Sequence, residues 1–262
     1  MSEQQITFND GAGYEKMMGV WSRLAGDIFL DWAAPPTGLR WIDVGCGNGA
    51  FTELLIERSA PVSVTGIDPS PAQLAFARQR HKAGVAQFHK GDAMALSFAD
   101  DSFDAAVMAL VIFFVPDPTK GLAEMVRVAR PGGLIAAYAW DILNGGFPLD
   151  PIQAELRALG ITPLLPPSVA VSRMEALEAL WRDGGLTDVA TREITVERTF
   201  EDFEEFWTTA QLGASVVQTI AGLAPDLREL LKKRVSERLP PDASGRITCS
   251  ARANAVQGRV KA

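Results

Sequence analysis

The amino-acid sequence predicts a doubly wound α/β fold, with a mostly parallel sheet and helical insertions. Short apolar runs alternate with helical patterns along the chain, as the strands and crossover helices of a parallel sheet require. A glycine-rich turn directly follows the first apolar run, and an acidic residue ends the second. Both features are typical of a doubly wound sheet that binds a nucleotide-like ligand at the carboxyl ends of its strands.

The elements can be placed from periodicity and from the turn residues between them. Short apolar runs predict buried strands, and apolar residues that recur every three or four positions predict helices. The expected strands are residues 41–43, 62–67, 86–89, 103–109, 134–139, 188–197 and 246–256. The expected helices are residues 15–33, 51–58, 72–82, 118–129, 173–183, 201–212 and 226–239.

The turn after the first strand has glycine at alternate positions, Gly45, Gly47 and Gly49. Without a Cβ atom, the backbone can turn sharply there and come close to a ligand. The helix expected to follow would point its free N–H groups and the positive end of its dipole at that ligand. Cys46 lies between the first two glycines and fits as a small filler. The loop therefore predicts a cradle for a nucleotide-like cofactor.

Two kinds of cofactor fit the loop at this point. Gly45, Gly47 and Ala50 match the dinucleotide pattern G-x-G-x-x-G/A. Asp43 argues against a dinucleotide, because a carboxylate beside the loop would repel a pyrophosphate and would suit an ammonium group. Asp68 ends the second strand, where an acidic residue commonly binds ribose hydroxyls. That residue serves NAD and any other adenosine cofactor equally.

Later blocks of the chain narrow the choice. Gly91-Asp92-Ala93 follows the third expected strand, residues 103–109 open the fourth, and residues 126–133 lead into the fifth. Taken in order with the first two strands, these blocks resemble the class I S-adenosylmethionine-dependent methyltransferases. The resemblance is to the small-molecule branch around the ubiquinone/menaquinone C-methyltransferases, and it spans about residues 38–141. Residues 14–23 are similar to the leader helix of one branch of that family.

The resemblance implies that the cofactor is S-adenosylmethionine and that its product is S-adenosylhomocysteine. It also assigns a place to each matching residue. The residues implied are Asp43, Gly45, Gly47, Gly49 and the backbone near Ala109 at the methionine part; Cys46 in the same loop; Asp68 at the ribose; Pro69, Ser70, Asp92 and Ala93 at the adenine; and Tyr14 and Trp21 closing the site from the leader.

The resemblance further implies a Rossmann-like, seven-stranded, mostly parallel sheet whose last strand is antiparallel. Residues 1–37 would form a leader helix or cap, residues 38–141 the cofactor-binding core, and residues 142–262 the remainder of the sheet. Two insertions, at about residues 142–171 and 200–241, interrupt that remainder. Because open α/β sheets bind ligands above the carboxyl ends of their strands, we expect these insertions to form a substrate lid.

Aromatic residues are the candidates for an acceptor pocket. Phe113 and Phe114 follow the fourth strand, where many relatives resemble one another in having a pair of histidines. Phe147, Phe206 and Trp207 lie in the expected insertions. The alternative for all of these residues is ordinary core packing.

No general base stands out, so the catalytic residue is unknown from sequence. Asp141 is a weak candidate, because it follows the fifth strand at the end where ligands bind. Methyl transfer from S-adenosylmethionine is compatible with the absence of a general base, since the sulfonium already activates the methyl group. We therefore expect in-line displacement that depends mainly on proximity and the exclusion of water, with a small molecule as acceptor.

Composition limits the partners and the surroundings. A formal net charge of −7 disfavours a nucleic-acid substrate, which would require clustered Lys and Arg residues. No apolar run approaches the length of a membrane span. Two cysteines do not make a metal cluster, and no metal is expected. The polar start at Met1-Ser2-Glu3 lacks a secretory signal, so the expected location is cytoplasmic. The leader and the insertions are candidates for a homodimer surface.

Two alternative functions stay open. An NAD-dependent oxidoreductase would need a catalytic Tyr/Lys pair, and neither Tyr14 nor Tyr138 has a lysine four positions later. A catalytically silent protein of the same fold would bind the cofactor without turning over any acceptor.

Overall fold

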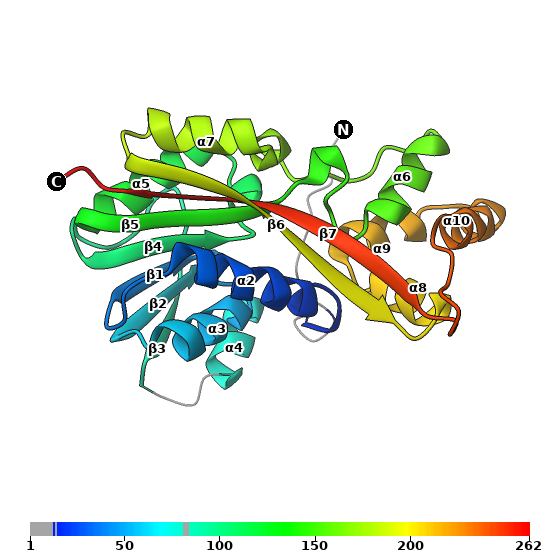
Figure 1. Ribbon diagram of the computed structural model, residues 1–262, viewed down its shortest axis with the longest axis horizontal. Coiled ribbons are helices and arrows are strands. Elements are labelled where there is room, and N and C mark those ends of the chain that lie inside the picture. The colour runs from blue at the N-terminus through cyan, green and yellow to red at the C-terminus, as the bar shows by residue number, and fades with distance from the viewer. Residues whose placement is uncertain (1–12, 14, 81–83) are drawn as a thin grey trace.

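The computed structural model describes residues 13, 15–80 and 84–262. Within them, seven strands form one sheet in the order β3-β2-β1-β4-β5-β7-β6 (Figure 1). All pairs among the first five strands are parallel, whereas β7 runs antiparallel to both of its neighbours. This confirms the predicted doubly wound, mostly parallel sheet. The strands are β1 (Arg40–Val44), β2 (Ser63–Asp68), β3 (Ala86–Lys90), β4 (Phe103–Ala109), β5 (Ala129–Trp140), β6 (Thr187–Phe200) and β7 (Ile247–Arg259).

The centre of the sheet is where the order of the strands reverses. β1 pairs with β2 on one side and with β4 on the other, so Ile42 lies between Thr65 and Ala106. Residues 41–44 of β1 are buried, as expected for a strand covered on both faces. Because successive crossovers leave in opposite directions from β1 and β4, a crevice opens above their carboxyl ends.

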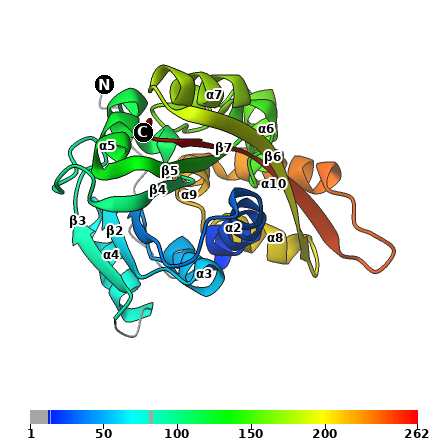
Figure 2. The ribbon, with the colours of Figure 1, turned by 60° about the vertical axis from the view of Figure 1, so that its left-hand side comes forward.

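Helices cover both faces of the sheet (Figures 1 and 2). α5 (Pro118–Val128) and α7 (Met174–Asp183) lie on one face; α2 (Val20–Ala33), α3 (Ala50–Ser59) and α4 (Pro71–Arg80) lie on the other. α2 packs closely on α3, since a Cβ atom at Gly26 would lie 2.7 Å from Leu54. Asp117 begins α5, where its side chain accepts a hydrogen bond from the backbone N–H of Lys120 at 3.0 Å.

The leader differs from the single helix expected over residues 15–33. It starts with one π-helical turn, η1 (Glu15–Gly19), and continues as α2. Arg198 of β6 donates to the carbonyl groups of Lys16 and Met17 in that turn. The turn thus receives hydrogen bonds from a distant strand.

The segments after β5 and β6 gather at one end of the molecule, beside the extended ends of β6 and β7 (Figure 1). The first contains η3 (Ile142–Asn144), α6 (Asp150–Ala158) and η4 (Val169–Ser172), and the second contains α8 (Phe203–Ala210), α9 (Ala214–Ala221) and α10 (Pro225–Arg238).

We call helices α6, α8, α9 and α10 the helical cap. Its two parts are joined by Glu155 of α6, which accepts hydrogen bonds from Arg234 at 2.7 Å and Arg238 at 2.8 Å, both on α10. Across the part of the chain that the structure describes, every helix is too short or too polar to cross a bilayer.

Candidate active site

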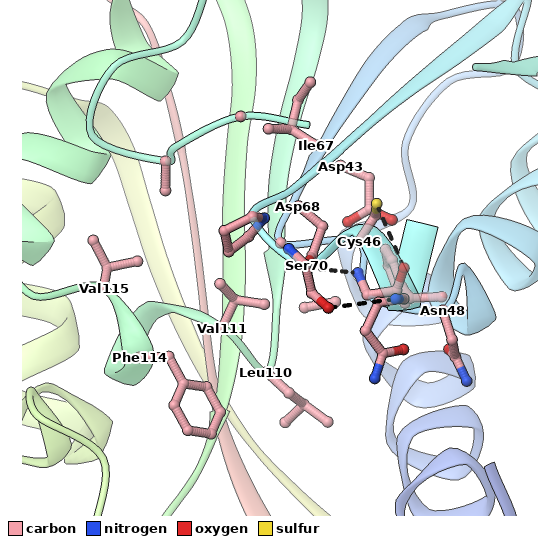
Figure 3. Close-up of a pocket in the computed structure, with 18 of the residues that line it drawn as sticks. Asp43, Cys46, Asn48, Ile67, Asp68, Ser70, Leu110, Val111, Phe114 and Val115 are labelled. Carbon is pink, nitrogen blue, oxygen red and sulfur yellow. Dashed lines mark hydrogen bonds between the residues drawn. The ribbon is translucent and has the colours of Figure 1, made fainter. Parts of the chain in front are cut away.

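A cavity of about 460 Å³ opens above the carboxyl ends of β1, β2 and β4 (Figure 3). One wall consists of the glycine loop and the end of β2, with Asp43, Cys46 and Asp68. The facing wall follows β4 and is apolar, with Val111 and Phe114 prominent. The cavity therefore lies at the point where the strand order reverses, as expected for an open α/β sheet.

The glycine loop is shaped by a close approach to the segment after β4. Gly45 has a φ of +79°, and a Cβ atom there would lie 2.4 Å from the side chain of Val111. The N–H groups of Gly45 and Cys46 both donate to the carbonyl of Ile67, at 2.7 and 3.0 Å. Only glycine satisfies both the backbone conformation and the contact with Val111.

Asp68 joins the loop to the start of α4. Its carboxylate accepts one hydrogen bond from the N–H of Gly47 at 2.9 Å and another from the N–H of Ser70 at 2.8 Å. Burial raises the pKa of Asp68, and these two hydrogen bonds act against the rise. Asp68 therefore sets the distance between the two loops of this wall; its expected contact with a ribose stays a prediction.

Asp43 is fully buried at the base of the loop. Its Oδ2 accepts a hydrogen bond of 2.6 Å from the Thr52 hydroxyl, but its Oδ1 has no partner among the described residues. Burial, together with the charge of Asp68, raises the pKa of Asp43 to about 7, although the Thr52 hydrogen bond lowers it. A buried carboxylate with an unused acceptor fits a cationic donor such as an ammonium group, and it would repel a pyrophosphate.

Two further polar atoms at the cavity have no partner among the described residues. They are the hydroxyl of Ser22, on α2, and the side-chain carbonyl of Gln73, on α4. Both residues are buried, and a buried polar group without a hydrogen bond is costly. Together with Asp43, they are buried polar groups of residues that line the cavity, and a ligand with an ammonium group and hydroxyls would supply partners of the kind they lack. S-Adenosylmethionine has both kinds of group, so the residues present fit it.

The remaining residues expected at the cofactor lie where the loops after β2, β3 and β4 meet the cavity. Pro69, Ser70, Asp92, Ala93 and Ala109 all contribute to its wall. The exposed Asp92 turns back on its own loop, accepting a hydrogen bond from the N–H of Met94 at 2.9 Å.

The chain leaves β4 through a strained residue. Leu110 has a φ of +61°, a conformation that costs a residue with a Cβ atom on the order of 1 kcal/mol. Its N–H donates to the carbonyl of Tyr138 at 2.8 Å, which holds the turn against β5. The turn leads into η2 (Ile112–Phe114) and brings Val111 and Phe114 to the cavity.

Other expected site residues lie away from the cavity wall. Gly49 caps the start of α3, and Trp21, 1% exposed, packs in the core. Tyr14 lies outside the described residues. Among the aromatic candidates for the acceptor pocket, Phe114 lines the cavity. Phe113 is buried, and its ring centroid lies 4.7 Å from that of Phe114.

The aromatic residues of the insertions also lie outside the cavity lining. Phe206 packs edge-on against Phe200 at 5.4 Å, and Trp207 stacks on Phe203 at 6.0 Å. Phe147 packs against the main core cluster. The expectation that these residues border an acceptor pocket stays a prediction; in the structure, Phe206 and Trp207 make ring contacts with Phe200 and Phe203.

Several lining residues were missed in the sequence. They are Ser22, Asn48, Gln73, Leu110, Val111, Val115 and Tyr138, together with a few neighbours of the loop. Ser22 and Tyr138 come from elements far apart in the chain, and the Tyr138 hydroxyl approaches the carbonyl of Ser22 at 3.5 Å. For Asn48 a local signal exists, because an asparagine before a helix commonly caps it; its Oδ1 accepts from the N–H of Ala50 at 3.2 Å.

Asp141, the weak catalytic candidate, has its carboxylate engaged elsewhere. It is 4% exposed and lies outside the cavity lining. Arg252 of β7 donates to it at 2.7 Å, and Asn144 donates at 2.9 Å. These contacts favour a structural role that fixes the segment after β5 to β7.

We expect Asp141→Asn to lower the free energy of unfolding by about 2 kcal/mol, because it breaks a largely buried ion pair. Affinity for S-adenosylhomocysteine should stay within twofold of the wild type. Urea denaturation and calorimetric titration measure the two effects. Glu193→Gln is the matched control, since the exposed Glu193 also pairs with Arg252, at 3.5 Å, and should change neither quantity. An Asp141→Asn protein of unchanged stability whose turnover falls tenfold would restore Asp141 as a catalytic residue.

The strand order, the glycine loop and the buried acidic residue beside it define the class I S-adenosylmethionine-dependent methyltransferase fold. Residues 42–137 match the family described as "Methyltransferase domain". This match covers somewhat more than a third of the chain, and that region is therefore similar to methyltransferase domains.

Curated relatives share this region of the chain. An uncharacterized protein of Mycobacterium tuberculosis is 32% identical over 161 residues, which cover 61% of this chain and 58% of that protein. The 2-methyl-6-phytyl-1,4-hydroquinone methyltransferase 2 of Oryza sativa is 42% identical over 96 residues, 37% of this chain and 28% of that protein. The match thus spans less than two thirds of the length of either relative.

A solved structure shows the same fold. The phosphoethanolamine N-methyltransferase 2 of Haemonchus contortus, in complex with phosphomonomethylethanolamine and S-adenosylhomocysteine, superposes with a TM-score of 0.58. The alignment covers 95% of this chain and 57% of that chain, at 18% identity. At this identity the likeness extends to the fold alone.

Proposed function

We propose that this protein transfers the methyl group of S-adenosylmethionine to a small-molecule acceptor. The observation that carries the proposal is the unpartnered Oδ1 of Asp43, a fully buried acceptor beside the glycine loop. It is the arrangement that an α-ammonium group of a methionine-derived cofactor would complete, and it disfavours a dinucleotide. The methyltransferase-domain match over residues 42–137 supports the same conclusion.

Each wall of the cavity has a distinct task in this proposal. Asp43 holds the ammonium end, and the bare backbone of Gly45 and Gly47 leaves room for the methionine part. Asp68 binds the ribose, in addition to its contacts with Gly47 and Ser70. Ser22, from the leader helix, offers its unpartnered hydroxyl to the polar end of the cofactor.

The apolar wall supports a reaction driven by alignment and by exclusion of water. When bound, the cofactor supplies a methyl group that its sulfonium already activates toward displacement. Val111, Phe114 and Val115 line the side of the cavity that faces Asp68 and exclude water from it (Figure 3). Proximity in such a site provides a large part of the rate enhancement in a displacement reaction. The attacking atom of the acceptor then needs little help from a protein base.

The same wall favours an apolar acceptor. A surface of valine and phenylalanine side chains binds aromatic or aliphatic groups through buried area and provides few partners for charged ones. The name of the rice relative, a hydroquinone methyltransferase, fits an acceptor of this kind. We therefore place apolar phenols and hydroquinones first among the acceptors to be tested.

Release of S-adenosylhomocysteine, measured over a panel of acceptors, tests the proposal. The panel comprises prenylated and simple hydroquinones, phenols, amines, thiols and carboxylates, with an acceptor-free reaction as the blank. We expect turnover with at least one apolar acceptor at more than ten times the blank rate. Cofactor binding without turnover of any acceptor would favour a catalytically silent protein of the same fold.

A further inference from the structure

The π-helical turn η1 lies between the glycine loop and the helical cap, and it contacts both. On the loop side, Oε2 of Glu15 accepts a hydrogen bond from Nδ2 of Asn48 at 2.9 Å. Asn48 is 2% exposed and lines the cavity, and its own Oδ1 accepts a hydrogen bond from the N–H of Ala50, the first residue of α3. The orientation of the Asn48 amide, and with it the end of the loop, is thus fixed from the leader.

Glu15 is itself held in place by a second set of contacts. Arg80 of α4 forms an ion pair with it at 2.5 Å and forms another with Glu53 of α3 at 2.7 Å. The carboxyl group also folds back over its own turn, since a Cβ atom at Gly19 would lie 2.9 Å from it. One carboxylate therefore joins the leader, the loop and α4.

On the side of the helical cap, Arg198 of β6 contacts the backbone of η1, and the side chain of Met17 contacts the cap itself. Nη1 of Arg198 donates to the carbonyls of Lys16 at 3.1 Å and Met17 at 3.0 Å. The methyl group of Met17 lies against Gly213, where a Cβ atom would approach it to 2.5 Å, and the same position borders Leu149. Gly213 joins α8 to α9, so η1 touches the cap at the junction of two of its helices.

We propose that Glu15 is a positioning residue for the cofactor loop, and that η1 couples the helical cap to that loop. The inference rests on the proposed function, because it assumes that the loop binds the cofactor. A loop whose Asn48 is held by Glu15 is preorganised, so less ordering is needed on binding. By thermodynamic linkage, the conformation of η1 in this structure and cofactor binding must stabilise each other to the same extent.

The first test compares two carboxylates that share one arginine. Glu15→Ala removes the contacts with Arg80 and Asn48, whereas Glu53→Ala removes only a contact with Arg80. We expect calorimetric titration to show S-adenosylhomocysteine affinity reduced about tenfold in the first variant and by less than twofold in the second. Glu15→Gln, which keeps an acceptor for Asn48, should restore most of the affinity.

A double-variant cycle tests whether Glu15 acts through Asn48. If it does, Glu15→Ala combined with Asn48→Ala binds no more weakly than Asn48→Ala alone. Fully additive losses would contradict the proposed route. Thermal unfolding of each variant checks that the proteins are folded, and affinity is compared only among those that are.

Hydrogen exchange separates a positioning role of Glu15 from a merely structural one, because a structural role would not change the protection that S-adenosylhomocysteine gives to η1. We expect S-adenosylhomocysteine to slow exchange at residues 16–21 in the wild type, and to do so much less in Glu15→Ala. Arg198→Met, on the cap side, should weaken the same protection.

The outcomes separate this inference from the proposed function. A wild-type protein that does not bind S-adenosylhomocysteine contradicts the proposed function. Wild-type binding with equal affinities in the Glu15→Ala and Glu53→Ala variants, and with unprotected residues 16–21, overturns the role of Glu15 and leaves the proposed function intact.

Discussion

Substitution of Gly45 by alanine is expected to lower the affinity for S-adenosylhomocysteine by about 100-fold or more. The new methyl group would overlap the branched side chain of Val111, 2.4 Å away, and the residue would retain a φ of +79° only with strain. The turn that leads to Val111 is held to β5 by the hydrogen bond from the Leu110 N–H to the Tyr138 carbonyl, so we expect the loop rather than Val111 to move. A shift of the loop of even about 1 Å displaces the groups that line the cavity.

Gly38→Ala is the matched control for this prediction. Gly38 has a φ of +76°, close to that of Gly45, but a Cβ atom there would meet nothing within 4 Å. We expect the control to lose about 1 kcal/mol of stability from backbone strain and to bind S-adenosylhomocysteine as the wild type does. Calorimetric titration of both variants makes the comparison, and a Gly45→Ala protein that binds within tenfold of wild type would show that the loop tolerates the contact.

Asp43→Asn is expected to have two opposite effects. Cofactor affinity should fall by about 100-fold, because the amide removes a buried charged partner for the ammonium group. The unliganded protein should nevertheless become more stable at pH 8, by about 2 kcal/mol, because ionising a fully buried carboxylate is costly and the amide avoids it.

The pH dependence fixes the sign of the stability effect. The pKa of Asp43 rises from 3.8 to about 7 on folding, so between these values the folded protein binds more protons than the unfolded one. The contribution of Asp43 therefore makes the wild type less stable as pH rises from about 4 to 7, with no further change above that. The Asp43→Asn variant lacks this decline, and urea denaturation at pH 5 and pH 8 measures the difference.

Asp104→Asn is a control for which we expect a stability change of the opposite sign at pH 8. The side-chain hydrogen bond from Arg40 holds the pKa of Asp104 below its usual value, despite some desolvation. Its ionised form is therefore stabilised by folding, and Asp104→Asn should destabilise the protein at pH 8 without affecting cofactor binding. Equal stability changes in the two variants at pH 8 would contradict the assignment of a raised pKa to Asp43.

The parts of the fold that were predictable are those encoded by neighbouring residues. The glycine loop, the acidic residue that ends β2, and the alternation of apolar runs with helical patterns all lie in short stretches of sequence. The first four parallel strands therefore agree with the prediction to within one residue at each end, whereas β5 begins at Ala129, five residues before the expected start at Leu134. The same holds for α3 and α5, whose starts are marked by Gly49 and by the Asp117-Pro118 pair.

The parts that were missed depend on contacts between distant segments. The sequence around Glu15 does not distinguish a π-helical turn from the α-helix that follows. The residues that contact this turn, Asn48, Arg80 and Arg198, come from three distant parts of the chain. α6 and α9 were not predicted, because a proline-rich insertion and an eight-residue helix give short patterns.

The site shows the same division. Asp43 and Asp68 follow from their position at strand ends, whereas Ser22 and Gln73 reach the cavity only because α2 and α4 pack beside it. Phe206 and Trp207 are candidates for the acceptor pocket because they lie in an expected insertion, and their helical spacing does not distinguish a residue that faces a cavity from one that faces a core. In the structure both pack within the cap.

Calorimetric titration of S-adenosylhomocysteine into the wild-type protein tests the central claim most directly. The prediction is a single site per chain, with affinity roughly eightfold higher at pH 7.5 than at pH 6, because Asp43 must be ionised to bind the ammonium group. Absence of binding at both pH values, or binding that NAD displaces, would contradict the assignment of the cavity to a methionine-derived cofactor.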